Sequence, residues 1–239
     1  MIQNKEYINI LVDYDNLAIK SSDIQSAIEH IASRILSQLK IDNSTMWYEA
    51  NFRLYGGWYD SNVLTRKAEE ITTILQDKFP VILNCYNCKI NVELSKSMLS
   101  QPSKDLLSTY RKRKGLSRLR VCKMNDVCCS NVESHMRYVK KLLRNKRCPE
   151  CGASSENLLW CSEQKLVDVM LAMDLSFLAM SEQEAHLSVV SSDDDFVPAI
   201  FQVCYLGKKV FHMHAKQNFS LNPLYQAIAP MAFYKEIAF

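Results

Sequence analysis

Aspartates gather at three places along this chain, and their placement suggests chemistry with a metal ion. Asp13 and Asn16 follow an apolar run in ILVDYDNL, and Asp193 and Asp195 follow another in VVSSDDDF. Asp168 lies between them, in KLVDVMLAMDL. Carboxylates that converge repel one another and need a cation, and Mg²⁺ and Mn²⁺ prefer such oxygen ligands. Ions of this kind activate water and stabilise the charge that develops when a phosphodiester is cleaved.

The elements that must position these side chains alternate along the sequence. Short apolar runs predict strands at 7–12, 50–56, 80–83, 187–191, 209–213 and 232–234. Helical spacing of apolar residues predicts helices at 24–39, 64–75, 132–144, 163–179, 196–205 and 223–229. This alternation is typical of a three-layer α/β fold with a mostly parallel sheet, which binds ligands at the carboxyl ends of its strands. Asp13 and Asp193 share one cleft if their two strands are neighbours.

Each aspartate also has a simpler explanation. A single aspartate after a strand is usually a turn residue or a helix cap, and Asp194 or Asp195 is suited to cap the helix that begins at Phe196. Asp174 lies about 240° around an ideal helix from Asp168. We therefore treat Asp174 as the weaker candidate for a shared site.

Three segments, in this order, resemble the signatures of NYN domains in the PIN-like nuclease superfamily: ILVDYDNL, KLVDVMLAMDL and VVSSDDDFVPAI. The resemblance implies a parallel sheet between helices and metal-dependent cleavage of RNA, or sometimes of DNA. It implies that four carboxylates bind Mg²⁺ or Mn²⁺ and that Asn16 is their polar partner. The four are Asp13, Asp168, Asp193 and Asp195.

The chain departs from the NYN pattern at three positions. Ser192 and Leu166 stand where such domains often carry glycine, and Asp194 replaces a small residue. None of these changes removes a carboxylate, so they do not argue against activity. The cysteine-bearing stretch before the helix of the second motif, KLVDVMLAMDL, is not part of the family core.

Charge is distributed unevenly along the chain. Residues 103–147 contain 14 Lys and Arg and 3 Asp and Glu, whereas the remaining chain has a net charge of −8. A basic run is often only a solvated surface, but an acidic body repels phosphate, and a separate basic surface restores attraction. The residues that we expect to bind nucleic acid are Arg111, Lys112, Arg113, Lys114, Arg118 and Arg120.

The nine cysteines include one good zinc motif. Cys148-Pro-Glu-Cys151-Gly is a tight turn that directs two thiolates at one ion, and structural zinc needs four ligands. Cys122 and Cys128 are candidates for the second pair, which stays open. The alternatives are Cys129, His135 and Cys161, with Cys85 and Cys88 as a separate CxxC pair. Free thiols in a turn are the simpler explanation for Cys148 and Cys151.

Together these patterns predict a discontinuous PIN-like NYN nuclease domain at 1–102 and 162–239, with a basic, zinc-binding insert at 103–161. The expected activity is hydrolysis of RNA or single-stranded nucleic acid, with ribonuclease favoured over deoxyribonuclease. The alternative is a catalytically silent module that binds nucleic acid. A phosphatase or nucleotide-binding domain is disfavoured, because the chain has no GxxxxGK[ST] loop.

The N-terminal apolar run is short and is interrupted by Asp13 and Asp15. It fits neither a signal peptide nor a membrane span, so we expect a cytoplasmic protein with no membrane partner. The sequence leaves the oligomeric state open, a homo-oligomer included.

Overall fold

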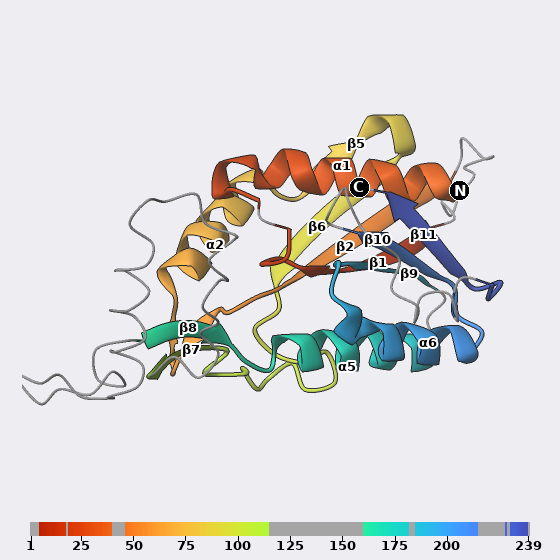
Figure 1. The fold of residues 1–239 in the computed structure, drawn as a ribbon. Helices are drawn as coiled ribbons and strands as arrows, with labels where there is room; N and C mark the ends of the chain where they lie inside the picture. The colour runs from red at the N-terminus through yellow and green to blue at the C-terminus, as the bar shows by residue number, and fades with distance from the viewer. Residues whose placement is uncertain are drawn as a thin grey trace, which may run out of the picture. The chain divides into compact units, whose positions relative to one another are not determined.

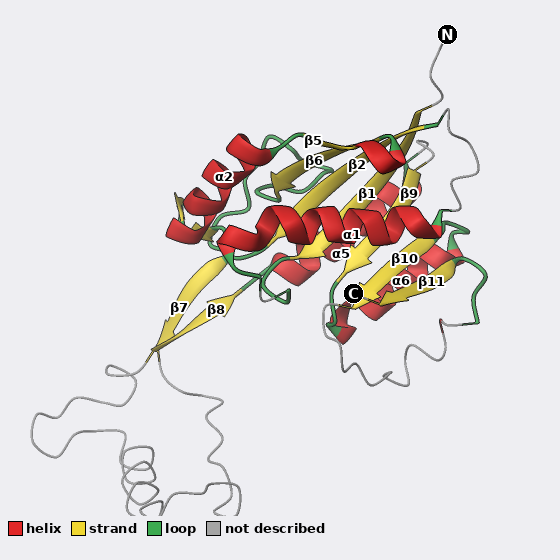
Figure 2. Ribbon diagram, turned by 90° about the horizontal axis from the view of Figure 1, so that it is seen from above, coloured by secondary structure: helices red, strands yellow, loops and turns green. Residues whose placement is uncertain are grey.

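The computed structural model describes residues 5–17, 19–39, 46–114, 160–181, 185–214, 228 and 230–238. The chain divides into two compact units, Met1–Thr109 with Gln164–Phe239, and Tyr110–Glu163. Residues 103–109, which we expected in the insert, belong to the first unit. Only the ends of the second unit are described, as strands β7 (Tyr110–Lys114) and β8 (Trp160–Gln164), which are hydrogen-bonded neighbours (Figure 2).

A seven-stranded sheet forms the centre of the first unit, in the order β11-β10-β9-β1-β2-β6-β5. Every neighbouring pair is parallel except β5 and β6. The expected α/β fold with a mostly parallel sheet is therefore confirmed. The strands are β1 (Lys5–Asp13), β2 (Trp47–Tyr55), β5 (Val81–Leu83), β6 (Cys88–Leu94), β9 (Ala185–Val190), β10 (Val210–His214) and β11 (Tyr234–Ala238).

Four helices in the described residues cover the two faces of this sheet (Figure 1). One face packs against α1 (Ile24–Gln38) and α2 (Arg66–Lys78), and the other against α5 (Val167–Met180) and α6 (Val197–Tyr205). Alternate residues of β1 serve the two cores: Ile8, Ile10 and Val12 join the α1 side, and Leu11 joins the α5 side. Burial on both sides explains the continuous apolar run at residues 10–12 of β1.

Short elements complete the described part of the first unit. They are the antiparallel pair β3 (Tyr59–Asp60) and β4 (Val63–Leu64), and the 3₁₀ helices η1 (Ser21–Asp23), η2 (Asn84–Tyr86) and η4 (Asp194–Phe196). Thr65 caps α2, because its side chain accepts a hydrogen bond from the Ala68 N–H at 3.3 Å. No helix among the described residues is long and apolar enough to cross a membrane.

The structure differs from the sequence predictions in several elements. Strands β3, β4, β7 and β8 were not predicted, and the last strand, expected at 232–234, is β11 at Tyr234–Ala238. Strand β6 was not predicted, and it pairs with β2 over its whole length. The helix expected from residue 163 begins at Val167, because β8 runs to Gln164 and Leu166 has a left-handed backbone with φ 68°. The expected helix at 132–144 lies outside the described residues, as does the one at 223–229 apart from Ile228.

Candidate metal centre at the ends of two parallel strands

Strands β1 and β9 are parallel neighbours, with Val12 beside Val190 in the last paired position. The condition for a shared cleft is therefore met, because Asp13 ends β1 and residues 191–195 directly follow β9. Ser191 joins the two segments. Its hydroxyl donates to Asp13 Oδ2 at 2.8 Å and accepts from the backbone N–H of Asp193 at 3.0 Å.

The carboxylates of this site interact electrostatically. Burial raises the pKa of Asp13 to about 6, and the charge of Asp168 adds to the rise, while the hydrogen bond from Ser191 opposes it. Burial also raises the pKa of Asp168, with further contributions from the charges of Asp193 and Asp195. Each of the four carboxylates is thus within electrostatic range of another, and Asp168 interacts with the other three.

The donor chemistry of this group fits a hard divalent cation, because all four side chains offer carboxylate oxygens that share a negative field. As the side chains stand, no three His, Cys, Asp or Glu groups in the described part of the chain are close enough to hold one ion. Asp13 and Asp193 accept hydrogen bonds from protein donors instead. Binding a cation at this position therefore requires side-chain rotation.

Asp193 is the N-cap of η4 and is also one of the four candidate metal ligands. Its Oδ1 accepts a hydrogen bond from the backbone N–H of Asp195 at 3.1 Å, which makes Asp193 the N-cap. Asp194 and Asp195 had been the expected caps. The correction matters little for the site, because capping engages one oxygen of a carboxylate that has two.

Asn16 lies in the turn that follows β1. Its backbone N–H donates to the Asp13 carbonyl at 3.2 Å, which closes the turn. Its side-chain Oδ1 is buried and makes no hydrogen bond in the structure. A buried amide oxygen without a donor is costly, and it is suited to accept from a water or to bind a cation.

Asp15 points into a separate polar network. Its carboxylate forms an ion pair with Lys67 of α2, accepts from the Gln164 side chain and lies 3.4 Å from the Gly57 N–H. Gly56 is needed beside it, because an added Cβ would lie 2.8 Å from the Trp58 ring and 3.0 Å from Asp15 Oδ2. Asp15 therefore ties the β1 turn to α2 and to Gln164.

Asp174 is buried on the sheet side of α5, where protein donors already engage its carboxylate. It accepts hydrogen bonds from Arg53 Nε at 3.2 Å, from the Tyr55 hydroxyl at 2.8 Å and from the Leu99 N–H at 2.8 Å. Both oxygens of this carboxylate therefore accept hydrogen bonds from protein donors, two of which lie in β2 and one in a loop. The expectation that Asp174 is the weaker candidate agrees with this network.

His212 of β10 contacts the Ser191 backbone beside the candidate site, and it was not predicted from the sequence. Its Nε2 lies 3.0 Å from the Ser191 carbonyl and its Nδ1 lies 3.0 Å from the Tyr234 hydroxyl. A carbonyl can only accept, so Nε2 carries the proton and Nδ1 accepts from Tyr234. Burial and the neighbouring His214 lower the pKa of His212 to about 3, so the ring is neutral. Alternating histidines in VFHMH were the available signal.

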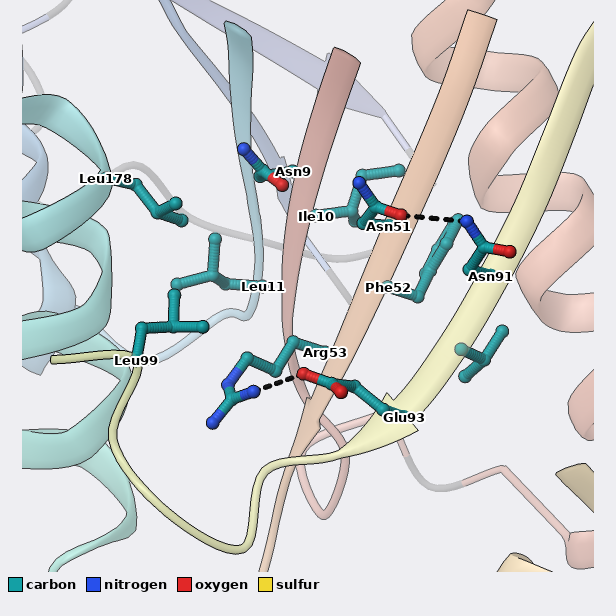
Figure 3. A pocket seen from close by; sticks show the side chains of 11 residues that line it. Asn9, Ile10, Leu11, Asn51, Phe52, Arg53, Asn91, Glu93, Leu99 and Leu178 are labelled. Carbon is teal, nitrogen blue, oxygen red and sulfur yellow. Dashed lines mark hydrogen bonds and ion pairs between the residues drawn. The ribbon is translucent and has the colours of Figure 1, made fainter. Parts of the chain in front are cut away.

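A polar groove lies elsewhere on the sheet, lined by residues of β1, β2 and β6 together with Leu99 and with Leu178 of α5 (Figure 3). Asn9, Asn51 and Asn91 occupy matching positions on β1, β2 and β6, and Asn91 Nδ2 donates to Asn51 Oδ1 at 2.9 Å. Arg53 and Glu93 form an ion pair at the wall of the groove. The groove has a volume of about 350 Å³ and contains none of the site aspartates.

The candidate nucleic-acid and zinc ligands of the second unit have no described side chains. Arg111, Lys112, Arg113 and Lys114 belong to β7, whose side chains are not described. Of the CxxC pair, Cys85 is exposed and Cys88 is buried, and burial raises the pKa of the Cys88 thiol to about 11, which disfavours a thiolate ligand. The remaining candidates lie outside the described residues: Arg118, Arg120, Cys122, Cys128, Cys129, His135, Cys148 and Cys151.

Comparison with known proteins found no matching family model, no similar curated protein and no similar solved structure. The fold itself defines the class of the protein as α/β with a mostly parallel sheet. The likeness to NYN domains depends on the three motifs.

Proposed function

We propose that this chain is a metal-dependent nuclease of the PIN-like NYN type that cleaves RNA or single-stranded nucleic acid. The observation that carries the proposal is the convergence of mutually repelling carboxylates from three distant motifs. Asp13 and Asp193 follow neighbouring parallel strands, and Asp168 interacts electrostatically with both. Such an arrangement is costly for folding, and a bound divalent cation would offset the cost.

The backbone at Leu166 supports the same proposal. Its φ of 68° lies in the left-handed region that favours glycine. NYN-like sequences often carry glycine at the matching position, so this chain keeps the backbone turn without the residue that makes it easy. The turn directly precedes α5 and brings Asp168 into the first helical turn.

In this proposal, Asp13, Asp168, Asp193 and Asp195 hold Mg²⁺ or Mn²⁺, which supplies an activated water and neutralises charge on the phosphate. Ser191 fixes the carboxylate of Asp13 through its hydroxyl, and His212 fixes the Ser191 carbonyl. Asn16 offers its buried amide oxygen to a water at the same turn. The raised pKa of Asp13 suits a group that exchanges a proton for a cation near neutral pH.

Two further parts of the proposal concern the second unit. The basic run that starts at Arg111 would bind phosphates, and zinc bound by Cys148 and Cys151 would stabilise the insert that carries it. A catalytically silent module that binds nucleic acid is the alternative. This alternative also uses the basic run to bind nucleic acid, and it differs from the nuclease proposal because it predicts no cleavage.

The direct test incubates the full chain with labelled RNA and DNA of one sequence, in Mn²⁺, in Mg²⁺ and with a chelator. The proposal predicts cleavage of RNA that depends on the cation and stops with the chelator. RNA that is bound and not cleaved under all conditions would favour the silent module. Cleavage that persists in the chelator would contradict the role of the carboxylates.

A further inference from the structure

The outward surfaces of α5 and α6 expose large apolar side chains. On α5 and the residue before it, the exposed fractions run from 41% to 68%, and on α6 and the residue after it from 43% to 75%. We call this surface the apolar helix face. Its residues are Leu166, Val169, Met173, Phe177, Met180, Phe201, Tyr205 and Leu206.

The spacing on α5 makes one continuous stripe. Val169, Met173, Phe177 and Met180 recur every three or four residues, which places them on one side of a helix. The opposite side packs into the core. A helix that is apolar all round is typical of one buried on both sides, yet within the described part of the chain α5 is covered on one side only.

The two helices present their exposed residues in the same direction. α5 and α6 are in contact and cover the same face of the sheet, so both outward sides point away from it (Figure 1). The stripe of α5 and the exposed residues of α6 therefore form one surface. Contiguous apolar patches of this size on a folded chain mark interaction sites.

This surface is almost free of charge. Within α5 the only charged residues are Asp168, in the candidate metal centre, and Asp174, which is buried and paired. Within α6 there is none. A symmetric dimer places the same surface of each copy against itself, so a charged surface would repel its own copy. The apolar helix face avoids that repulsion.

The area is also sufficient for a symmetric dimer. The exposed fractions of these eight residues, applied to side chains of about 150 to 250 Å² each, amount to roughly 800 Å² of removable surface per copy. A stable interface of standard size buries about 800 Å² per partner. Methionine and aromatic side chains, which make up five of the eight, are enriched at interfaces.

We propose that the apolar helix face is the interface of a symmetric homodimer of this chain. The interface is formed by α5 and α6 against the same helices of the second copy. This inference is independent of the proposed nuclease activity, because no side chain of the apolar helix face is assigned to the carboxylate site, where Leu166 contributes only its backbone turn.

The test measures the mass of the full chain by sedimentation over a wide range of concentration. A wild-type chain with twice the monomer mass of 27.6 kDa is expected. Met173→Glu with Phe177→Glu should weaken dimerisation roughly 100-fold or more, because like charges then face one another across the interface. Ile82→Glu is the matched control, since Ile82 is 51% exposed and lies outside the apolar helix face. This control should dimerise like the wild type.

Hydrogen exchange of the wild-type chain at high and low concentration gives a second measurement that needs no substitution. Slower exchange in residues 166–180 and 197–206 at high concentration is expected. A wild-type chain that stays monomeric overturns the proposal. A dimer whose protection lies elsewhere, or a folded double variant that dimerises normally, also overturns it.

Discussion

At the scale of single residues, the candidate site depends on side chains that connect distant segments. Ser191 touches both Asp13 and the Asp193 backbone, and His212 holds the Ser191 carbonyl. The sequence could mark the aspartates because carboxylates after strands are recognisable in a pattern. It could not mark Ser191, since a hydroxyl acquires its role only from partners on other strands, and the alternating histidines of VFHMH indicated His212 without giving its partners.

Asp174 provides a residue-scale prediction about stability. Replacing it with Asn removes the charge that faces Arg53, which is 12% exposed, and weakens the acceptor for Tyr55. Breaking one partner of a buried pair costs about 3 to 5 kcal/mol. Urea denaturation of Asp174→Asn should show a loss in the lower part of this range, because Glu93 still pairs with Arg53. An unchanged free energy of unfolding would mean that the network contributes nothing.

His212 provides a prediction about pH. Its pKa is about 3 in the folded chain and about 6.5 when unfolded, so between these values only the unfolded chain takes up the proton. Stability should therefore fall as pH drops below 6.5, by up to about 1.4 kcal/mol per pH unit from this group. The free energy of unfolding of His212→Gln should fall less steeply than that of the wild type between roughly pH 6 and pH 4, where only the unfolded chain binds the His212 proton.

Comparing the wild type with His212→Gln isolates the contribution of His212 to the pH dependence of stability. His214, whose pKa is lowered to about 4, and Asp13, whose raised pKa acts in the opposite direction, titrate in both. The free energy of unfolding is measured for each chain at several pH values. Parallel curves for the wild type and the variant would show that His212 is not the buried neutral group described above.

At the scale of elements, the sequence predicted those whose apolar residues carry an unambiguous period. β1 and β9 were found because both are buried on two faces and read as apolar runs. β6 was missed because the prediction counted continuous apolar runs as strands, whereas CKINVEL alternates apolar with polar residues, a period of two that itself favours a half-buried strand. The start of α5 was placed too early because the left-handed turn at Leu166 carries no glycine to mark it.

The basic run in β7 provides a prediction about binding at this scale. Changing Arg111, Lys112, Arg113 and Lys114 to Gln removes up to four phosphate contacts, each contributing roughly 0.7 to 0.9 to the slope of log affinity against log salt. We expect weaker binding of RNA with a shallower slope, and little change in turnover at saturating substrate. Asp168→Asn should do the reverse. Normal affinity and slope in the four-residue variant would make this run only a solvated surface.

At the scale of the whole molecule, the chain divides its charge between two compact units. The unit Tyr110–Glu163 contains 13 Lys and Arg and 5 Asp and Glu, whereas the other unit contains 16 and 21. Binding by one unit and chemistry by the other is the division of labour that this distribution suggests. The separation of charge can be read from composition, whereas the ligands of the insert cannot, because five open candidates compete for two positions.

Zinc content tests the proposed role of the insert. Freshly purified protein should contain about one zinc per chain that survives removal of Mg²⁺ and Mn²⁺, because thiolates favour zinc and carboxylates favour harder ions. Elemental analysis measures this directly. Changing Cys148 and Cys151 to Ser should remove the zinc. Protein without zinc after expression in ample zinc would contradict the site, and zinc retained by the double variant would place it elsewhere.

Cleavage by single carboxylate variants tests the central claim most directly. Asp13→Asn and Asp193→Asn keep the size of each side chain and remove a charged ligand, and Asp77→Asn makes the same change at an exposed residue of α2. With labelled RNA and Mn²⁺, we predict that the first two variants lose more than about 100-fold in turnover, while remaining folded. Asp77→Asn should cleave like the wild type. Wild-type turnover in either Asp13→Asn or Asp193→Asn would contradict the assignment of the metal centre.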